Sequence, residues 1–146
     1  MKSRLIYWLT YAGMWLLALL PFKVLYILSD GLCFLMHHVV HYRRRVVRAN
    51  LCNAFPEKSA AELRDIEREF YRYICDYMLE EVKMLRMSFK ELCRRMEYDN
   101  KEEYLAMIEK HGGIVLLIPH YANFEWITGM SSIMQEGDIP VQIYKP

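Results

Sequence analysis

The stretch Gly112-Gly113-Ile114-Val115-Leu116-Leu117-Ile118-Pro119-His120-Tyr121-Ala122-Asn123-Phe124-Glu125-Trp126 decides the expected fold. The apolar run 114–118 has the length and composition of a β-strand that is covered on both faces. The pattern around it predicts one helix before this strand, over 101–110, and another after it, over 124–134. A second strand is expected at 141–144. Because helices and strands alternate, the sequence predicts an α/β fold with the beginning of a parallel sheet.

His120 and Glu125 lie five residues apart, just after the expected strand. On a single helix two such side chains would point about 140° apart, so the chain has to turn between them. Asn123 is a favourable N-terminal cap for the helix that follows, which puts Glu125 in its first turn and His120 in the loop before it. We therefore expect the imidazole and the carboxylate to meet at the edge of the sheet, where α/β proteins bind ligands.

Such a pair predicts a general base. A neutral imidazole, with a reference pKa of about 6.5, accepts a proton near pH 7, and a carboxylate fixes its tautomer and stabilises the imidazolium ion. The simplest use of His120 is to activate a substrate hydroxyl for attack on an acyl group, and Asn123 is a candidate for substrate contact. A structural alternative stays open, in which His120 bonds to local backbone and Glu125 interacts with the helix dipole.

The beginning of the chain is strongly apolar. Residues 5–20 carry no charge, and a second apolar run covers 31–40. The first run is slightly shorter than the roughly 17–25 residues of a transmembrane helix, and the small residues of a secretory cleavage site do not follow it. We expect residues 1–40 to form a hydrophobic membrane anchor that either spans the bilayer or lies in its interface. A buried core helix is the remaining alternative.

Four arginines follow the apolar segment within six residues, namely Arg43, Arg44, Arg45 and Arg48. Beside a membrane anchor they suit anionic lipid headgroups, where each contributes about 1 kcal/mol, and they favour the cytoplasmic side. The alternative is a solvated helix face with dispersed salt bridges. The formal net charge of the whole chain is only +1, which argues against nucleic acid as a partner.

The middle of the chain is expected to be helical. Ser59 and Glu62 have the spacing of a capping box, and apolar residues then recur at three- and four-residue steps as far as Leu85. Charged residues such as Glu67 are assigned to the other faces of this helix. Ser88 begins a second segment with the same capping pattern.

Metal binding is disfavoured by the sequence. The four cysteines form no CxxC pair, so we expect reduced thiols rather than a zinc or redox site. His37, His38 and His41 cluster, but no nearby carboxylate or cysteine completes a set of ligands. We therefore expect no metal site.

Four blocks of the sequence resemble one known family. They are 42–51 (YRRRVVRANL), 54–56 (AFP), 120–126 (HYANFEW) and 143–146 (IYKP). These blocks resemble the lipid A biosynthesis acyltransferases, the lauroyl/myristoyl (late) family of the glycerolipid acyltransferases with an HX4(D/E) motif. Ala122, Phe124 and Lys145 depart from the family pattern, which has Gly, Trp and Arg at these positions.

The resemblance implies a membrane-bound enzyme on the cytoplasmic face of the bacterial inner membrane. Such an enzyme transfers an acyl chain from acyl carrier protein to a hydroxyl of a lipid A precursor, with His120 as the base, Glu125 as its partner, and no cofactor. Residues 41–146 are then the N-terminal part of the acyltransferase domain, and we expect the chain to be truncated. The alternative is a catalytically inactive, membrane-associated helical scaffold.

Overall fold

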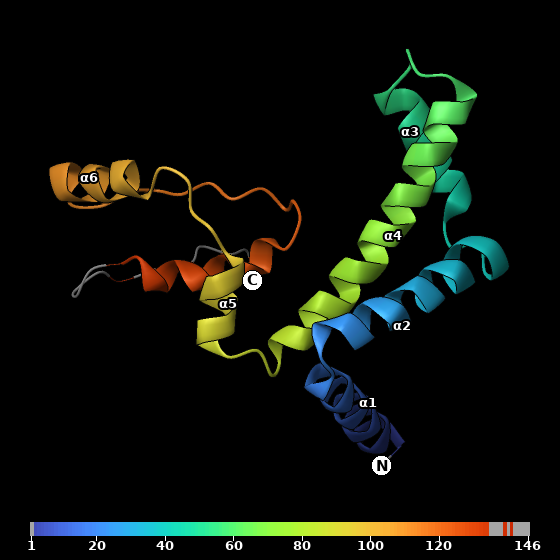
Figure 1. Cartoon of the computed structure of the whole chain (residues 1–146), viewed down its shortest axis with the longest axis horizontal. Helices are drawn as coiled ribbons and strands as arrows, with labels where there is room; N and C mark the ends of the chain where they lie inside the picture. The colour runs from blue at the N-terminus through green and yellow to red at the C-terminus, as the bar shows by residue number, and fades with distance from the viewer. Residues whose placement is uncertain (1, 135–138, 140, 142–146) are drawn as a thin grey trace. The chain divides into compact units, whose positions relative to one another are not determined.

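The computed structural model describes residues 2–134, 139 and 141, and the chain divides into two compact units, Met1–Arg86 and Met87–Pro146 (Figure 1). The first unit contains α1 (Lys2–Leu19), α2 (Phe22–Phe34), the short π-helix η1 (Leu35–Val39), α3 (Arg44–Ala54) and α4 (Ala60–Met84). The second contains α5 (Phe89–Arg95), α6 (Lys101–His111) and the 3₁₀-helix η2 (Phe124–Ser132). The predicted functional division into 1–40 and 41–146 stays a prediction.

The prediction of an α/β fold is wrong, because the described part of the chain contains helices and no strand (Figure 1). Residues 114–118 form no regular element, and Val115 and Leu117 are 82% and 88% exposed. An apolar run becomes a stable strand only when neighbouring strands take up its backbone hydrogen bonds. The described residues supply no such neighbour. The second expected strand, 141–144, falls almost wholly outside the described residues.

Helix α4 organises the first unit, since α1, α2, η1 and α3 all contact it. The predicted capping box at its start is confirmed: the Ser59 hydroxyl accepts from the Glu62 amide, and the Glu62 carboxylate accepts from the Ser59 amide. This pair satisfies two backbone donors that the first turn of a helix would otherwise leave open. The helix buries a line of residues at four-residue steps, namely Glu67, Tyr71, Cys75 and Leu79.

Lys83 fixes the end of α1 to α4. Its ammonium group donates hydrogen bonds to the carbonyl oxygens of Ala18 and Leu20, at 2.8 and 2.7 Å. These carbonyls lie at the carboxyl end of α1, where the last turn of a helix lacks intrahelical donors and the helix dipole is negative. One lysine therefore satisfies two backbone acceptors and neutralises the helix end.

Most of α1 has no protein partner for its apolar side chains. The segment 5–20, the first apolar run of the predicted anchor 1–40, leaves large side chains exposed, including Leu5, Ile6, Trp8 and Leu9. By length and composition, one helical segment among the described residues is able to cross a membrane, and it is Phe22–Val39 rather than 5–20. Only 22% of that segment is buried. Both apolar segments therefore expose apolar side chains on the surface of the first unit.

The second unit has a small core. Helices α5 and η2 pack through the buried side chains of Leu92 and Trp126. Gly129 permits this contact, because a Cβ at this position would lie 3.1 Å from the Tyr98 hydroxyl and 3.3 Å from Leu92 Cγ. The predicted helix 101–110 is confirmed as α6, and Gly112 ends it with a φ of 71°.

The cysteines offer a test of the packing around α4. All four are free; Cys75 is fully buried, and burial raises its pKa to about 11, whereas Cys52 is exposed. Because the thiolate is the reactive form, an aromatic disulfide reagent at mildly alkaline pH should modify Cys52 much faster than Cys75. Cys52→Ser should remove the fast phase, and Cys75→Ser should leave it. Equal modification rates for the two thiols in the folded protein would contradict this packing.

Candidate functional site

His120 lies in a loop and Glu125 in the first turn of the following helix, as predicted, but the expected strand and sheet edge beside them are absent from the described residues. His120 lies exposed in the loop after 114–118, and Glu125 lies partly buried in the first turn of η2. The imidazole stacks on the Phe124 ring, with ring centroids 4.2 Å apart and planes 10° apart. The interactions described for His120 include no hydrogen bond or ion pair with Glu125. The predicted pairing of these two side chains stays a prediction, since catalytic hydrogen bonds often tighten only when substrate binds.

The turn between the two residues is made at Ala122. Its φ is 52°, in the left-handed region that glycine adopts without cost and an alanine does not. Glycine, which the resembling family pattern has at this position, would adopt this conformation without that cost. Asn123 stands at the N-cap position of η2, but its side chain makes no capping hydrogen bond with the helix.

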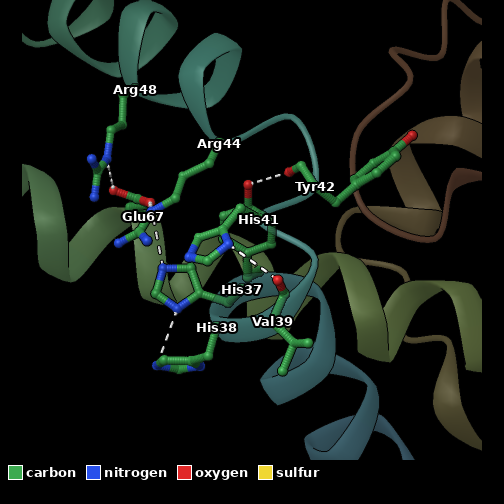
Figure 2. A network of polar contacts seen from close by, with 9 residues as sticks. His37, His38, Val39, His41, Tyr42, Arg44, Arg48 and Glu67 are labelled. Carbon is green, nitrogen blue, oxygen red and sulfur yellow. Dashed lines mark hydrogen bonds and ion pairs between the residues drawn. The ribbon is translucent and has the colours of Figure 1, made fainter.

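A second candidate site lies wholly in the first unit and is centred on Glu67 (Figure 2). The Glu67 side chain is 2% exposed, and each of its two carboxylate oxygens accepts a hydrogen bond from a different arginine. Arg44 Nε donates to Oε1 and Arg48 Nε donates to Oε2, both at 2.7 Å. These charge-assisted bonds compensate for the burial of the carboxylate.

The electrostatic balance at Glu67 favours the charged form. Burial by itself raises the pKa of a carboxyl group, because the charged form loses its hydration. At Glu67 the hydrogen bonds and positive charges of Arg48 and Arg44 outweigh that effect, and the pKa lies below its ordinary value. Glu67 is therefore negatively charged at neutral pH, and this charge binds α3 to α4.

The segment that delivers these side chains has unusual backbone geometry. In η1 the amide of Val40 bonds to the carbonyl of Leu35, the wider spacing of a π-helix, and such turns are frequent at functional sites. His41 and Arg43, with φ of 53° and 50°, then adopt left-handed conformations that cost L-residues free energy. The Tyr71 hydroxyl donates to the Tyr42 carbonyl and holds this segment to α4.

An open cavity of about 430 Å³ lies beside the Glu67 network. It is lined by residues of η1, α3 and α4, namely His37, His38, Arg44, Ala61, Arg64, Asp65, Glu67 and Arg68. His37 is the deepest of the imidazoles: it is 6% exposed, and its Nε2 lies 3.4 Å from Glu67 Oε1. Within the part of the chain that the structure describes, no group of three His, Cys, Asp or Glu side chains is placed to hold a metal ion.

The four predicted lipid-contacting arginines divide into two pairs. Arg44 and Arg48 bind Glu67, whereas Arg43 and Arg45 are exposed and make no ion pair in the described residues. Sequence analysis missed Glu67 by assigning it to a polar face of α4. Its four-residue spacing from Tyr71 was a usable signal, because that spacing puts both side chains on one face of a helix.

Comparison with known proteins identifies one family. Residues 1–141 match the family described as bacterial lipid A biosynthesis acyltransferase. The chain belongs to this family. It is similar to the lipid A biosynthesis lauroyltransferase of Escherichia coli (strain K12), with 26% identity over 143 residues, which are 96% of this chain and 46% of that protein. The chain thus spans about half the length of the curated relative that it matches, and no solved structure matches it. The family predicted from the sequence is confirmed.

The Glu67 network predicts a specific dependence of stability on pH. Because the pKa of Glu67 is lowered in the folded state, its contribution is complete above the unfolded pKa and is lost as pH falls through the folded pKa. Glu67→Gln should lower the free energy of unfolding at pH 7 by about 2 kcal/mol, since both arginines lose their charged partner but remain partly hydrated. It should also flatten the loss of stability in acid. Denaturant titrations followed by far-UV circular dichroism at a series of pH values measure both effects.

Glu69→Gln is the matched control, because Glu69 is an exposed acid on the same helix. That variant should behave as the parent protein does at neutral pH and in acid. An acid profile of Glu67→Gln that superimposes on the parent profile would show that the buried carboxylate does not stabilise the unit.

Proposed function

We propose that this protein transfers an acyl chain from acyl carrier protein to a hydroxyl group of a lipid A precursor, at the cytoplasmic face of the bacterial inner membrane. The observation that carries the proposal is the family match over residues 1–141, which includes the His120 loop. The name of the E. coli relative, a lipid A biosynthesis lauroyltransferase, supports acyl transfer as the type of reaction.

In this proposal His120 is the general base. Its imidazole is exposed in the loop and accessible to a substrate, and its stacking on Phe124 limits the orientations of the ring. A neutral ring nitrogen takes the proton of the acceptor hydroxyl as the oxygen attacks the thioester carbonyl. The carbon–sulfur bond then breaks, and the imidazolium returns its proton to the departing thiolate. The reaction balances without a cofactor.

Glu125 is proposed as the partner that orients the imidazole and stabilises its positive charge. It lies partly buried in the first turn of η2, five residues after His120. Partial burial strengthens the interaction of a carboxylate with a nearby imidazolium ion, because the local dielectric is lower than in water. Asn123, at the start of the same helix, is proposed to contact substrate.

Substitutions in the intact protein test this assignment. His120→Ala should lower kcat for acyl transfer from acyl carrier protein by about 10²- to 10⁴-fold, because the hydroxyl loses its base. Glu125→Ala should lower kcat by a smaller factor, about 10- to 100-fold, because the base remains but loses its partner. Transfer of a labelled acyl chain to the lipid A precursor measures both rates.

His111→Ala, which changes an exposed histidine at the end of α6, should leave the rate unchanged. Full activity of His120→Ala would refute the assignment of the base. A folded intact protein that transfers no acyl chain at all would instead favour the alternative, a membrane-associated helical scaffold.

The first unit supports the membrane part of the proposal. Helix α1 exposes a dense apolar surface that no described residue covers. Helix α2 packs along α4, which carries exposed charged residues on most of its turns. If Phe22–Val39 spanned the bilayer, α4 would carry these charges into hydrocarbon at about 2.5–3.5 kcal/mol each. We therefore propose that α1 and α2 lie in the membrane interface with the charged face of α4 toward water.

A charge on the apolar face of α1 should weaken membrane binding. Leu9→Glu should reduce binding to phosphatidylethanolamine–phosphatidylglycerol vesicles by about tenfold, because an apolar side chain that enters the acyl region becomes an anion. Met107→Glu, at an exposed position on α6, should bind as the parent protein does. Flotation with vesicles measures both, and equal binding of Leu9→Glu and parent would exclude α1 as the contact.

A further inference from the structure

The beginning of α3 carries several positively charged side chains at the end of the helix where positive charge is energetically unfavourable. Arg43 is the N-cap residue, Arg44 and Arg45 open the first turn, and no acidic residue stands in that turn. The amino end of a helix is the positive end of its dipole, so cations at this position are unfavourable and anions are favourable. This arrangement therefore favours a bound anion close to the start of α3.

Glu67 supplies only part of the negative charge that these arginines favour. Its single carboxylate is shared between two guanidinium groups, those of Arg44 and Arg48. On the α4 side of the adjacent cavity, Arg68 pairs with Asp65, and Arg64 makes no ion pair in the described residues. Three guanidinium groups and two carboxylates thus line one cavity, and Arg48 adds a further positive charge at Glu67, so the site has excess positive charge.

The cavity also contains a buried polar group with poor hydrogen bonding. His37 lines it and is 6% exposed, and its Nε2 faces the Glu67 carboxylate (Figure 2). The contact of this nitrogen with Glu67, at 3.4 Å, is long for a hydrogen bond. Buried polar atoms are nearly always satisfied, so a nitrogen in this position has capacity for a ligand.

Backbone geometry independently marks the same place. The π-helix η1 and the left-handed residues His41 and Arg43 all fall in the segment that borders the cavity. Strained conformations persist when the surrounding structure holds them, and they cluster at ligand sites. Excess positive charge, a buried imidazole and strained backbone conformations therefore occur together at the junction of η1, α3 and α4.

We propose that the cavity between η1, α3 and α4 binds a phosphate group. A phosphate offers several strong acceptor oxygens and one or two negative charges, which match the guanidinium donors of Arg44 and Arg64 and the imidazoles of His37 and His38. A cavity of about 430 Å³ that opens to solvent has room for the phosphate together with part of its ester substituent. This proposal does not depend on acyl transfer at His120.

The first experiment measures saturable binding of inorganic phosphate by calorimetry. The parent chain should bind, and Arg64→Gln should weaken binding about tenfold or more, because one charged donor to the phosphate is lost. Arg72→Gln is the matched control: Arg72 lies on the same helix, is similarly exposed, and is not part of the cavity. That variant should bind as the parent does.

The second experiment separates a lipid phosphate from a soluble one. Phosphatidylcholine vesicles are doped either with phosphatidic acid or with oleic acid adjusted to the same surface charge. If the site takes a lipid headgroup, Arg64→Gln should reduce binding to the phosphatidic acid vesicles and leave binding to the oleic acid vesicles unchanged. If the site takes soluble phosphate, the loss should appear in the calorimetry alone.

Either pattern supports a phosphate site. Arg64→Lys, which retains the charge, should recover part of the binding, and circular dichroism should show the same helix content in every variant. Equal behaviour of Arg64→Gln and Arg72→Gln in both experiments, or the absence of phosphate binding by the parent in both, would overturn the proposal.

Discussion

The ion pairs of Glu67 with Arg44 and Arg48 are the interaction on which the first unit depends. An isolated carboxylate inside a protein is costly, and it is retained only where charged partners bind both of its oxygens. Those partners come from α3, whereas Glu67 comes from α4, so satisfying the charge also fixes the position of α3. The left-handed residues between η1 and α3 are tolerated because these contacts, together with the hydrogen bond from Tyr71, hold the segment in place.

The same logic applies at the other end of α4. Lys83 satisfies the last carbonyls of α1 and thereby helps to orient a helix whose large apolar side chains are mostly exposed. Polar contacts with α4 help to position α1 and α3, and α2 makes the most extensive contact with α4. This leaves a large apolar surface open on α1, as is typical of membrane-active helices, and it concentrates positive charge beside α3.

Local sequence signals were reliable where neighbouring residues alone decide the conformation. The capping box of Ser59 and Glu62 and the glycine stop after α6 were predicted correctly, because each depends on backbone groups within a few residues. The strand at 114–118 was predicted wrongly, because a strand needs a partner that its own residues do not supply. The burial of Glu67 was missed because a charged residue is expected on the solvent-exposed face of a helix. Its four-residue spacing from Tyr71 puts it on the same helix face as that buried residue.

The sequence by itself indicated the family, the start of α4, the position of α6, and the loop position of His120 with Glu125 in the following helix turn. These follow from motifs and from hydrogen bonds between close neighbours. Only the tertiary structure decided that Arg44 and Arg48, rather than Arg43 and Arg45, bind the buried Glu67, and that His37 borders a cavity lined by arginines. The physical reason is that the free energy of a charged side chain depends on its distance from other charges and from water. In this chain the decisive charges lie about twenty residues apart in sequence and meet only when α3 packs on α4.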